Sequence, residues 1–127
     1  MGIDIYMKWR KQSKKEADAQ CTGCCVEAGR VGYLREAYHG EPYATRHLVR
    51  EAFDPPYEAE IPAKTLRERL PKTIELAVKR LRVVYKVPGN DAELKKHKDV
   101  KSFIDFVELA ERKEKETGEP VIINASY

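Results

Sequence analysis

The chain has 127 residues, 42% of them hydrophobic and 35% charged, and carries a formal net charge of +3 at pH 7. This length suits a single domain over residues 1–127 with one hydrophobic core. No apolar run approaches the roughly 20 residues that cross a bilayer, and the first residues lack the apolar stretch of a secretory signal. We therefore expect a cytoplasmic protein without a membrane partner. The near balance of charge argues against nucleic-acid binding on composition alone.

The first predicted element is a strand over residues 3–9, because apolar side chains occupy every second position of this segment. Residues 11–20 are polar and predict either a loop or a short exposed helix. Residues that favour β-structure recur from Arg30 to Ala37 and predict a second strand. The end of this strand stays open, since the residues from Leu34 onward could also begin a helical turn.

Three cysteines lie between these elements, at Cys21, Cys24 and Cys25. A structural zinc site needs four ligands, usually from two such pairs, and the sequence offers no second pair. A redox-active pair is expected at a helix start, whereas Thr22 and Gly23 indicate a turn. An odd number of cysteines suits a reducing compartment. We expect small, partly buried cysteines with no metal and no cofactor, while the pattern alone leaves metal binding open.

A turn is predicted at Gly40–Pro42 and a short helix from Tyr43 to Phe53. Asp54 precedes two prolines and ends this helix, because proline disfavours the helical conformation in the residue before it.

The longest helical pattern runs from Pro62 to Tyr85. Pro71 lies inside it, and an interior proline removes one backbone hydrogen bond, so we expect a kink or break at Leu70. Beyond the proline, apolar residues recur with the helical period and predict a buried stripe at Ile74, Ala77, Val78, Leu81 and Tyr85.

The last part of the chain predicts a capped turn, a helix and a strand. Asn90 and Glu93 have the spacing of a reciprocal helix cap. A final helix from Val100 to Thr117 is expected to end at Gly118, and Val121–Tyr127 to form the last strand. This helix is expected to bury Val100, Phe103, Ile104, Phe106, Val107 and Ala110.

These elements define an α+β fold, because the helices are grouped between strands and do not alternate regularly with them. We expect one small mixed or antiparallel sheet that includes the N- and C-terminal strands as neighbours. About three helices should pack against one face of this sheet.

The segment around the Gly40–Pro42 turn is the richest in functional side chains. Guanidinium groups can bind a carboxylate or phosphate, phenol rings can stack, and imidazole can exchange protons near neutral pH. We expect a non-enzymatic binding module for a small anionic ligand or a protein partner, provided that these side chains converge on one hollow. The candidate residues are Arg35, Tyr38, His39, Tyr43, Arg46 and His47.

A nucleic-acid-associated protein is the first alternative. Residues 64–86 contain eight basic and two acidic residues, a composition that could follow a phosphate backbone. On a helix over residues 72–86 one face would carry Lys72, Lys79, Arg82 and Lys86. The second alternative is a small hydrolase or transferase with His39 as general base, although neither a nucleophile nor a Gly-rich phosphate loop accompanies it.

Two apolar residues of the long helix, Leu76 and Val83, lie away from the predicted core stripe. Their exposure would favour a second packing surface, so we also consider a homodimer.

Three short motifs resemble a family of small bacterial and phage-type proteins to which no activity is attached. They are the opening Met-Gly-Ile-Asp-Ile-Tyr, the stretch Gly32-Tyr-Leu-Arg-Glu-Ala-Tyr-His-Gly40 and the closing Ile-Asn-Ala-Ser-Tyr. The resemblance implies a bacterial or prophage cytoplasmic origin and transfers no site residue.

Overall fold

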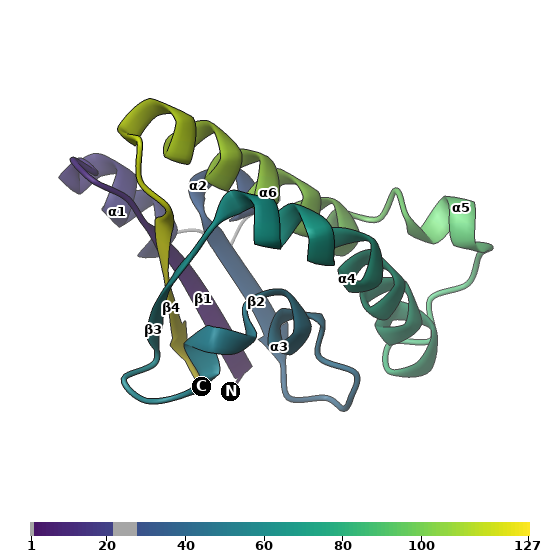
Figure 1. The fold of residues 1–127 in the computed structure, drawn as a ribbon. Coiled ribbons are helices and arrows are strands. Elements are labelled where there is room, and N and C mark those ends of the chain that lie inside the picture. The colour runs from purple at the N-terminus through teal and green to yellow at the C-terminus, as the bar shows by residue number, and fades with distance from the viewer. Residues whose placement is uncertain (1, 22–27) are drawn as a thin grey trace.

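Four strands form one antiparallel sheet in the order β2-β1-β4-β3 (Figure 1). A computed structural model describes residues 2–21 and 28–127, including the backbone but not the side chain of Cys21. The elements are β1 (Gly2–Lys8), α1 (Lys14–Cys21), α2 (Ala28–Val31), β2 (Tyr33–Ala37), α3 (Ala44–Leu48), the 3-10 helix η1 (Arg50–Phe53), β3 (Glu58–Ile61), α4 (Ala63–Val83), α5 (Asp91–Leu94), α6 (Lys98–Thr117) and β4 (Val121–Ser126). The predicted α+β class is confirmed.

The first and last strands are neighbours, as predicted. In β1, Ile5 lies opposite Leu34 of β2 on one side and Ala125 of β4 on the other. Both chain ends therefore lie at the same end of the sheet (Figure 1). The antiparallel arrangement is the correct one of the two alternatives.

The hydrophobic core lies between one face of the sheet and the two long helices, α4 and α6, which pack side by side (Figure 1). The alternating residues Ile3, Ile5 and Met7 of β1 are fully buried on this face. Asp4 and Tyr6 point to the opposite face and remain partly exposed. The strict alternation in the sequence thus corresponds to two faces of different polarity.

The long helix α4 runs unbroken from Ala63 to Val83 and contains Pro71, so of the predicted kink or break at Leu70 the break is wrong. Buried apolar residues on both sides of the proline, Leu66 and Leu70 before it and Ala77 and Leu81 after it, pack the helix against the core. This packing supports the helix across the lost hydrogen bond.

The predicted apolar stripes are mostly buried. In α4, Ala77, Val78 and Leu81 are buried, whereas Ile74 is only partly buried. Tyr85 lies beyond the helix and is 41% exposed. In α6, Ile104 is partly buried and the remaining predicted core residues are buried, together with Leu109.

Three local predictions require correction. The strand β3, Glu58–Ile61, was not predicted, because its short Glu-Ala-Glu-Ile sequence buries only Ile61. The segment before Tyr33 forms the short helix α2, so the second strand begins later than Arg30. The helix predicted from Tyr43 to Phe53 divides at Val49, whose backbone leaves the helical region (φ −123°, ψ 43°).

The predicted cap at Asn90 and the predicted end of the last helix at Gly118 are both present. The side chain of Asn90 accepts a hydrogen bond from the Glu93 amide, and the Glu93 carboxylate accepts one from the Asn90 amide. Gly118 ends α6 in the left-handed conformation at φ 75°, which glycine adopts without steric cost. Among the described residues, no helix is long and apolar enough to cross a membrane.

Candidate binding surface around Arg46

An exposed arginine surrounded by aromatic rings lies at the end of the sheet that carries both chain ends. The Cζ atom of Arg46 lies 4.8 Å from the ring centre of Phe53, 5.2 Å from that of Tyr127 and 5.8 Å from that of Tyr43. Two further tyrosines extend the group, and we call the six residues the Arg46 cluster: Tyr38, Tyr43, Arg46, Phe53, Tyr57 and Tyr127.

The rings of the Arg46 cluster contact one another edge to face or in tilted pairs. Tyr38 and Tyr43 are 6.1 Å apart, Phe53 and Tyr127 are 5.1 Å apart, and Tyr57 and Tyr127 are 5.6 Å apart. The Tyr127 hydroxyl also donates a hydrogen bond to the Phe53 carbonyl at 2.8 Å. These contacts hold the rings in fixed positions relative to Arg46.

Each residue of the Arg46 cluster comes from the end of a different element or from α3 itself. Tyr38 follows β2, Tyr43 caps α3, and Phe53 ends η1. Tyr57 directly precedes β3, and Tyr127 directly follows β4. Because β3 and β4 are paired and η1 packs against both, the sheet and the short helices bring these residues together (Figure 1).

A second arginine, Arg80 of α4, supports the cluster from inside. Its guanidinium lies 4.9 Å from the Tyr43 ring centre, while Arg46 lies 5.8 Å from the same ring. Arg80 also donates hydrogen bonds to the carbonyls of Ala37, Gly40 and Pro42. Arg80 is only 5% exposed, so these bonds fix the loop that carries Tyr38 and Tyr43.

A buried carboxylate fixes the start of α3. Glu36 of β2 accepts hydrogen bonds from the amides of Ala44 and Thr45, each at 2.9 Å, and from the Thr45 hydroxyl. The guanidinium of Arg80 lies 3.9 Å from the same carboxylate. Arg46 is the next residue of the helix, so the Glu36–Arg80 pair positions Arg46.

The surface of the cluster is accessible. Tyr38, Tyr57 and Tyr127 are 40%, 42% and 48% exposed, and Arg46 is exposed as well. Among residues 2–21 and 28–127, no carboxylate lies within ion-pair distance of Arg46. The Arg46 guanidinium therefore lies against the rings with its charge exposed to solvent.

Tyr57 has the left-handed backbone conformation, with φ 65°. This conformation costs a residue with a side chain about 1–2 kcal/mol. Two backbone hydrogen bonds hold this conformation. The Tyr57 amide donates to the Asp54 carbonyl, and the Tyr57 carbonyl accepts from the Ala125 amide. Backbone strain of this kind concentrates at binding and catalytic sites.

The structure brings together three of the six residues predicted from the sequence, namely Tyr38, Tyr43 and Arg46. Arg35 lies on the outer face of the sheet, where it donates a hydrogen bond to Asp4 at 2.7 Å. The ring of His39 contacts that of Tyr85 at 5.8 Å. The six side chains therefore do not line one hollow.

The partner of Arg35, Asp4, also accepts a hydrogen bond from the Tyr33 hydroxyl. Burial of Tyr33 and this bond to Asp4 raise the pKa of the Tyr33 hydroxyl to about 12. These groups satisfy one another and form a structural network on the sheet face.

His47 of α3 faces cations on η1 and α4. Burial lowers the pKa of His47, and the charges of Arg50, Arg69 and Lys72 lower it further. The imidazole therefore remains neutral to lower pH than an isolated histidine would.

The four residues of the nucleic-acid alternative have different environments. Lys72 pairs with Glu75 at 3.4 Å, and Arg82 pairs with Asp91. Lys86 lies outside α4, which ends at Val83, so the prediction of one shared helical face is wrong for Lys86. Lys79 lines a pocket beside Arg82.

The apolar residues considered for a homodimer also differ. Leu76 packs against the core and is partly buried, so its predicted exposure is wrong. Val83 is 57% exposed.

The interpretation of Cys21, Cys24 and Cys25 concerns side chains outside the described part of the chain. Within the part that the structure describes, no three His, Cys, Asp or Glu side chains are placed to hold a metal ion.

Sequence reasoning missed Phe53, Tyr57, Tyr127 and Arg80. Tyr57 and Tyr127 are close because β3 pairs with β4, and β3 carries too weak a pattern to predict. Arg80 is one of many basic residues in the long helix, and nothing in the sequence indicates that it is buried. Comparisons of the chain with family models, with curated proteins and with solved structures found no match.

Proposed function

We propose that this protein is a non-enzymatic module that binds a protein partner through the Arg46 cluster. The observation that carries the proposal is the exposed guanidinium of Arg46, which lies against three aromatic rings and has no carboxylate of the described residues within ion-pair distance. The chemistry fits a partner segment with an Asp or Glu side chain beside an apolar residue. The carboxylate of the partner would accept hydrogen bonds from the Arg46 guanidinium, and the apolar residue of the partner would pack on the tyrosine rings.

The composition of the cluster supports a protein partner. Tyrosine and arginine are enriched at the residues that dominate protein–protein affinity, because each combines a large contact area with directed hydrogen bonds. The arginine is already oriented, so less conformational entropy is lost on binding.

The extent of the cluster favours a protein segment over a small anion. Contacts of 5.2–6.1 Å link Tyr38, Tyr43, Arg46, Tyr127 and Tyr57 into a continuous row. A small anion would contact only its centre, at Arg46.

The charge around the cluster favours a protein over a nucleic acid. Two cations of neighbouring elements are matched by acids, since Arg69 pairs with Glu51 at 2.6 Å and Lys8 with Glu58 at 3.6 Å. A phosphate backbone requires several unpaired cations in a row.

Selection from a displayed library of random short peptides tests the proposal. Peptides enriched on the native protein should contain an acidic residue next to an apolar one. Their affinity should fall at least tenfold for Arg46→Ala, as expected for a central arginine. Enriched peptides that bind Arg46→Ala and the native protein equally, or the absence of any enrichment, would refute the proposal.

Two further variants locate the effect. Arg46→Lys keeps the charge but lacks the planar group that stacks on the rings and forks onto a carboxylate, so affinity should also fall. Arg112→Ala removes a cation from α6, outside the cluster, and should leave the affinity unchanged.

A further inference from the structure

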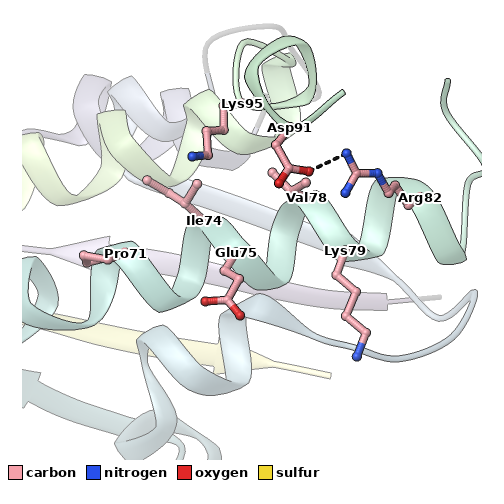
Figure 2. Close-up of a pocket in the computed structure, with 8 residues that line it drawn as sticks. All are labelled: Pro71, Ile74, Glu75, Val78, Lys79, Arg82, Asp91 and Lys95. Atoms are coloured by element: carbon pink, nitrogen blue, oxygen red, sulfur yellow. Dashed lines mark ion pairs between the residues drawn. The ribbon is translucent and has the colours of Figure 1, made fainter. Parts of the chain in front are cut away.

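A pocket of about 550 Å³ lies between α4 and α5, away from the Arg46 cluster. Its apolar wall is formed by Pro71, Ile74 and Val78, which follow one another on a single face of α4. Figure 2 shows Ile74 and Val78 pointing from α4 toward Lys95 and Asp91 at α5. The volume lies within the range of small-molecule sites, roughly 300–1,000 Å³.

The pocket is held open by contacts that exist without a ligand. Arg82 of α4 pairs with Asp91, the first residue of α5 (Figure 2). The cap formed by Asn90 and Glu93 orients α5, and the buried Leu94 anchors it in the core. Because the pocket is already formed, a ligand would lose no binding energy to opening it.

Pro71 is an exposed residue in the middle of α4, and it forms part of the pocket wall. Proline in a helix interior costs about 3 kcal/mol. The Pro71 side chain is itself exposed, so it adds no packing in the core, and the helix relies on its buried neighbours on both sides. Local features that reduce stability in this way concentrate at functional sites.

Some charged residues that line the pocket have ion-pair partners among the described residues, and others do not. Asp91 is paired with Arg82, and Glu75 with Lys72. In the described part of the chain, no carboxylate lies within ion-pair distance of Lys95 or Lys79. Figure 2 shows the Lys95 side chain extending above Ile74, whereas Lys79 points away from α5. The pocket therefore combines an apolar wall with one available ammonium group beside it.

We propose that this pocket binds a small organic carboxylate with an apolar body. The body would lie against Pro71, Ile74 and Val78, and the carboxylate would accept hydrogen bonds from the ammonium group of Lys95. This site is independent of the Arg46 cluster and does not depend on the function proposed for it.

Titration of the full chain with decanoate and with 2-naphthoate, followed by backbone amide NMR, tests the proposal. The two probes share a carboxylate and differ in an aliphatic or aromatic body, so their relative affinities identify the preferred body. Saturable shifts should appear at Ile74, Val78 and Lys95 with at least one probe. The proposal is wrong if neither probe shifts these residues, or if the shifts lie elsewhere.

Substitutions separate the charge from the apolar wall. Lys95→Glu should weaken binding at least tenfold by reversing the charge beside the carboxylate. Ile74→Trp should abolish binding by filling the pocket, and because Ile74 is only partly buried, a second variant with Ile74→Gln tests the same wall without added bulk. Equal binding by native protein and Lys95→Glu would overturn the assignment.

Two controls complete the experiment. Lys101→Glu makes the same charge change at an exposed position of α6 outside the pocket and should leave the affinity unchanged. Decyltrimethylammonium, which carries the opposite charge on a similar chain, should bind the native protein at least tenfold more weakly than decanoate. Equal binding of both amphiphiles would show that apolar contact alone is responsible and would contradict the role of Lys95.

Discussion

Two arginines lie against the same tyrosine ring, and their environments differ in almost every respect. Arg80 is 5% exposed, pairs with the buried Glu36 and donates to three backbone carbonyls. Arg46, against the same Tyr43, is exposed, and its guanidinium lies beside three aromatic rings without an ion pair to any described residue.

The difference is what the proposed function requires, with one arginine stabilising the fold and the other free to bind. The donors of Arg80 are used to hold the loop at residues 37–43, and a buried charge of this kind must be paired for the fold to be stable. The donors of Arg46 are not used by the described residues, and three rings hold its side chain in place. The same residue type therefore supports the fold on one side of Tyr43, and on the other side it is the group that we propose binds a partner.

The largest effect is expected from Arg80→Ala. The substitution leaves Glu36 as a buried charge without its partner and frees the carbonyls that Arg80 bonds. The free energy of unfolding in urea should fall by about 3–5 kcal/mol. A loss below about 1 kcal/mol would show that the pair does not support the fold. The double variant Arg80→Met with Glu36→Gln should recover part of the loss, because it removes both charges.

A smaller effect is expected from Thr45→Val, which keeps the shape of the side chain and removes the hydroxyl that bonds Glu36. Thr45 is fully buried, so the unfolding free energy should fall by about 1–2 kcal/mol. The matched control is Thr65→Val at a partly exposed position of α4, where little change is expected. If both substitutions lower the unfolding free energy equally, the loss at Thr45 does not come from its hydrogen bond to Glu36.

Arg46→Ala should change stability less than either buried substitution. Cation–π contacts at exposed sites contribute about 0.5–1 kcal/mol, and this is the expected loss in urea unfolding. A loss as large as that of Arg80→Ala would show that Arg46 stabilises the fold and contradict its proposed role in binding.

The smallest effect concerns pH. The pKa of His47 is lowered in the folded state from its ordinary value of 6.5, so the unfolded chain binds more protons between the two values. The contribution of His47 to the free energy of unfolding should therefore be fully present above pH 6.5 and decrease as the pH falls below this value. His47→Gln should show a smaller decrease in unfolding free energy on acidification than the native protein. An identical decrease would show that His47 does not contribute.

The sequence allowed prediction of those elements whose patterns are local. Strict alternation in residues 3–9 predicted β1, and the helical period of the last third predicted α6 and its end at Gly118. The proline signal at Pro71 was misleading, because packing on both sides of it supports α4, a contribution that local sequence does not reveal.

Only half of the proposed binding surface could be predicted from the sequence, for a related reason. Tyr38, Tyr43 and Arg46 are close in sequence, so their clustering could be proposed directly. Tyr57 and Tyr127 join them through the pairing of β3 with β4, which depends on tertiary structure. Arg35 is close in sequence but alternates to the outer face of β2, where Asp4 binds it.

Amide NMR of the native chain with a selected acidic peptide tests the central claim most directly. Shifts at residues 43–46, 53 and 57 that are absent in Arg46→Ala, together with unfolding free energies of the two proteins within about 1 kcal/mol of each other, are the predicted result. Shifts confined to the pocket between α4 and α5, or unchanged shifts in Arg46→Ala, would contradict the assignment of Arg46 as the binding group.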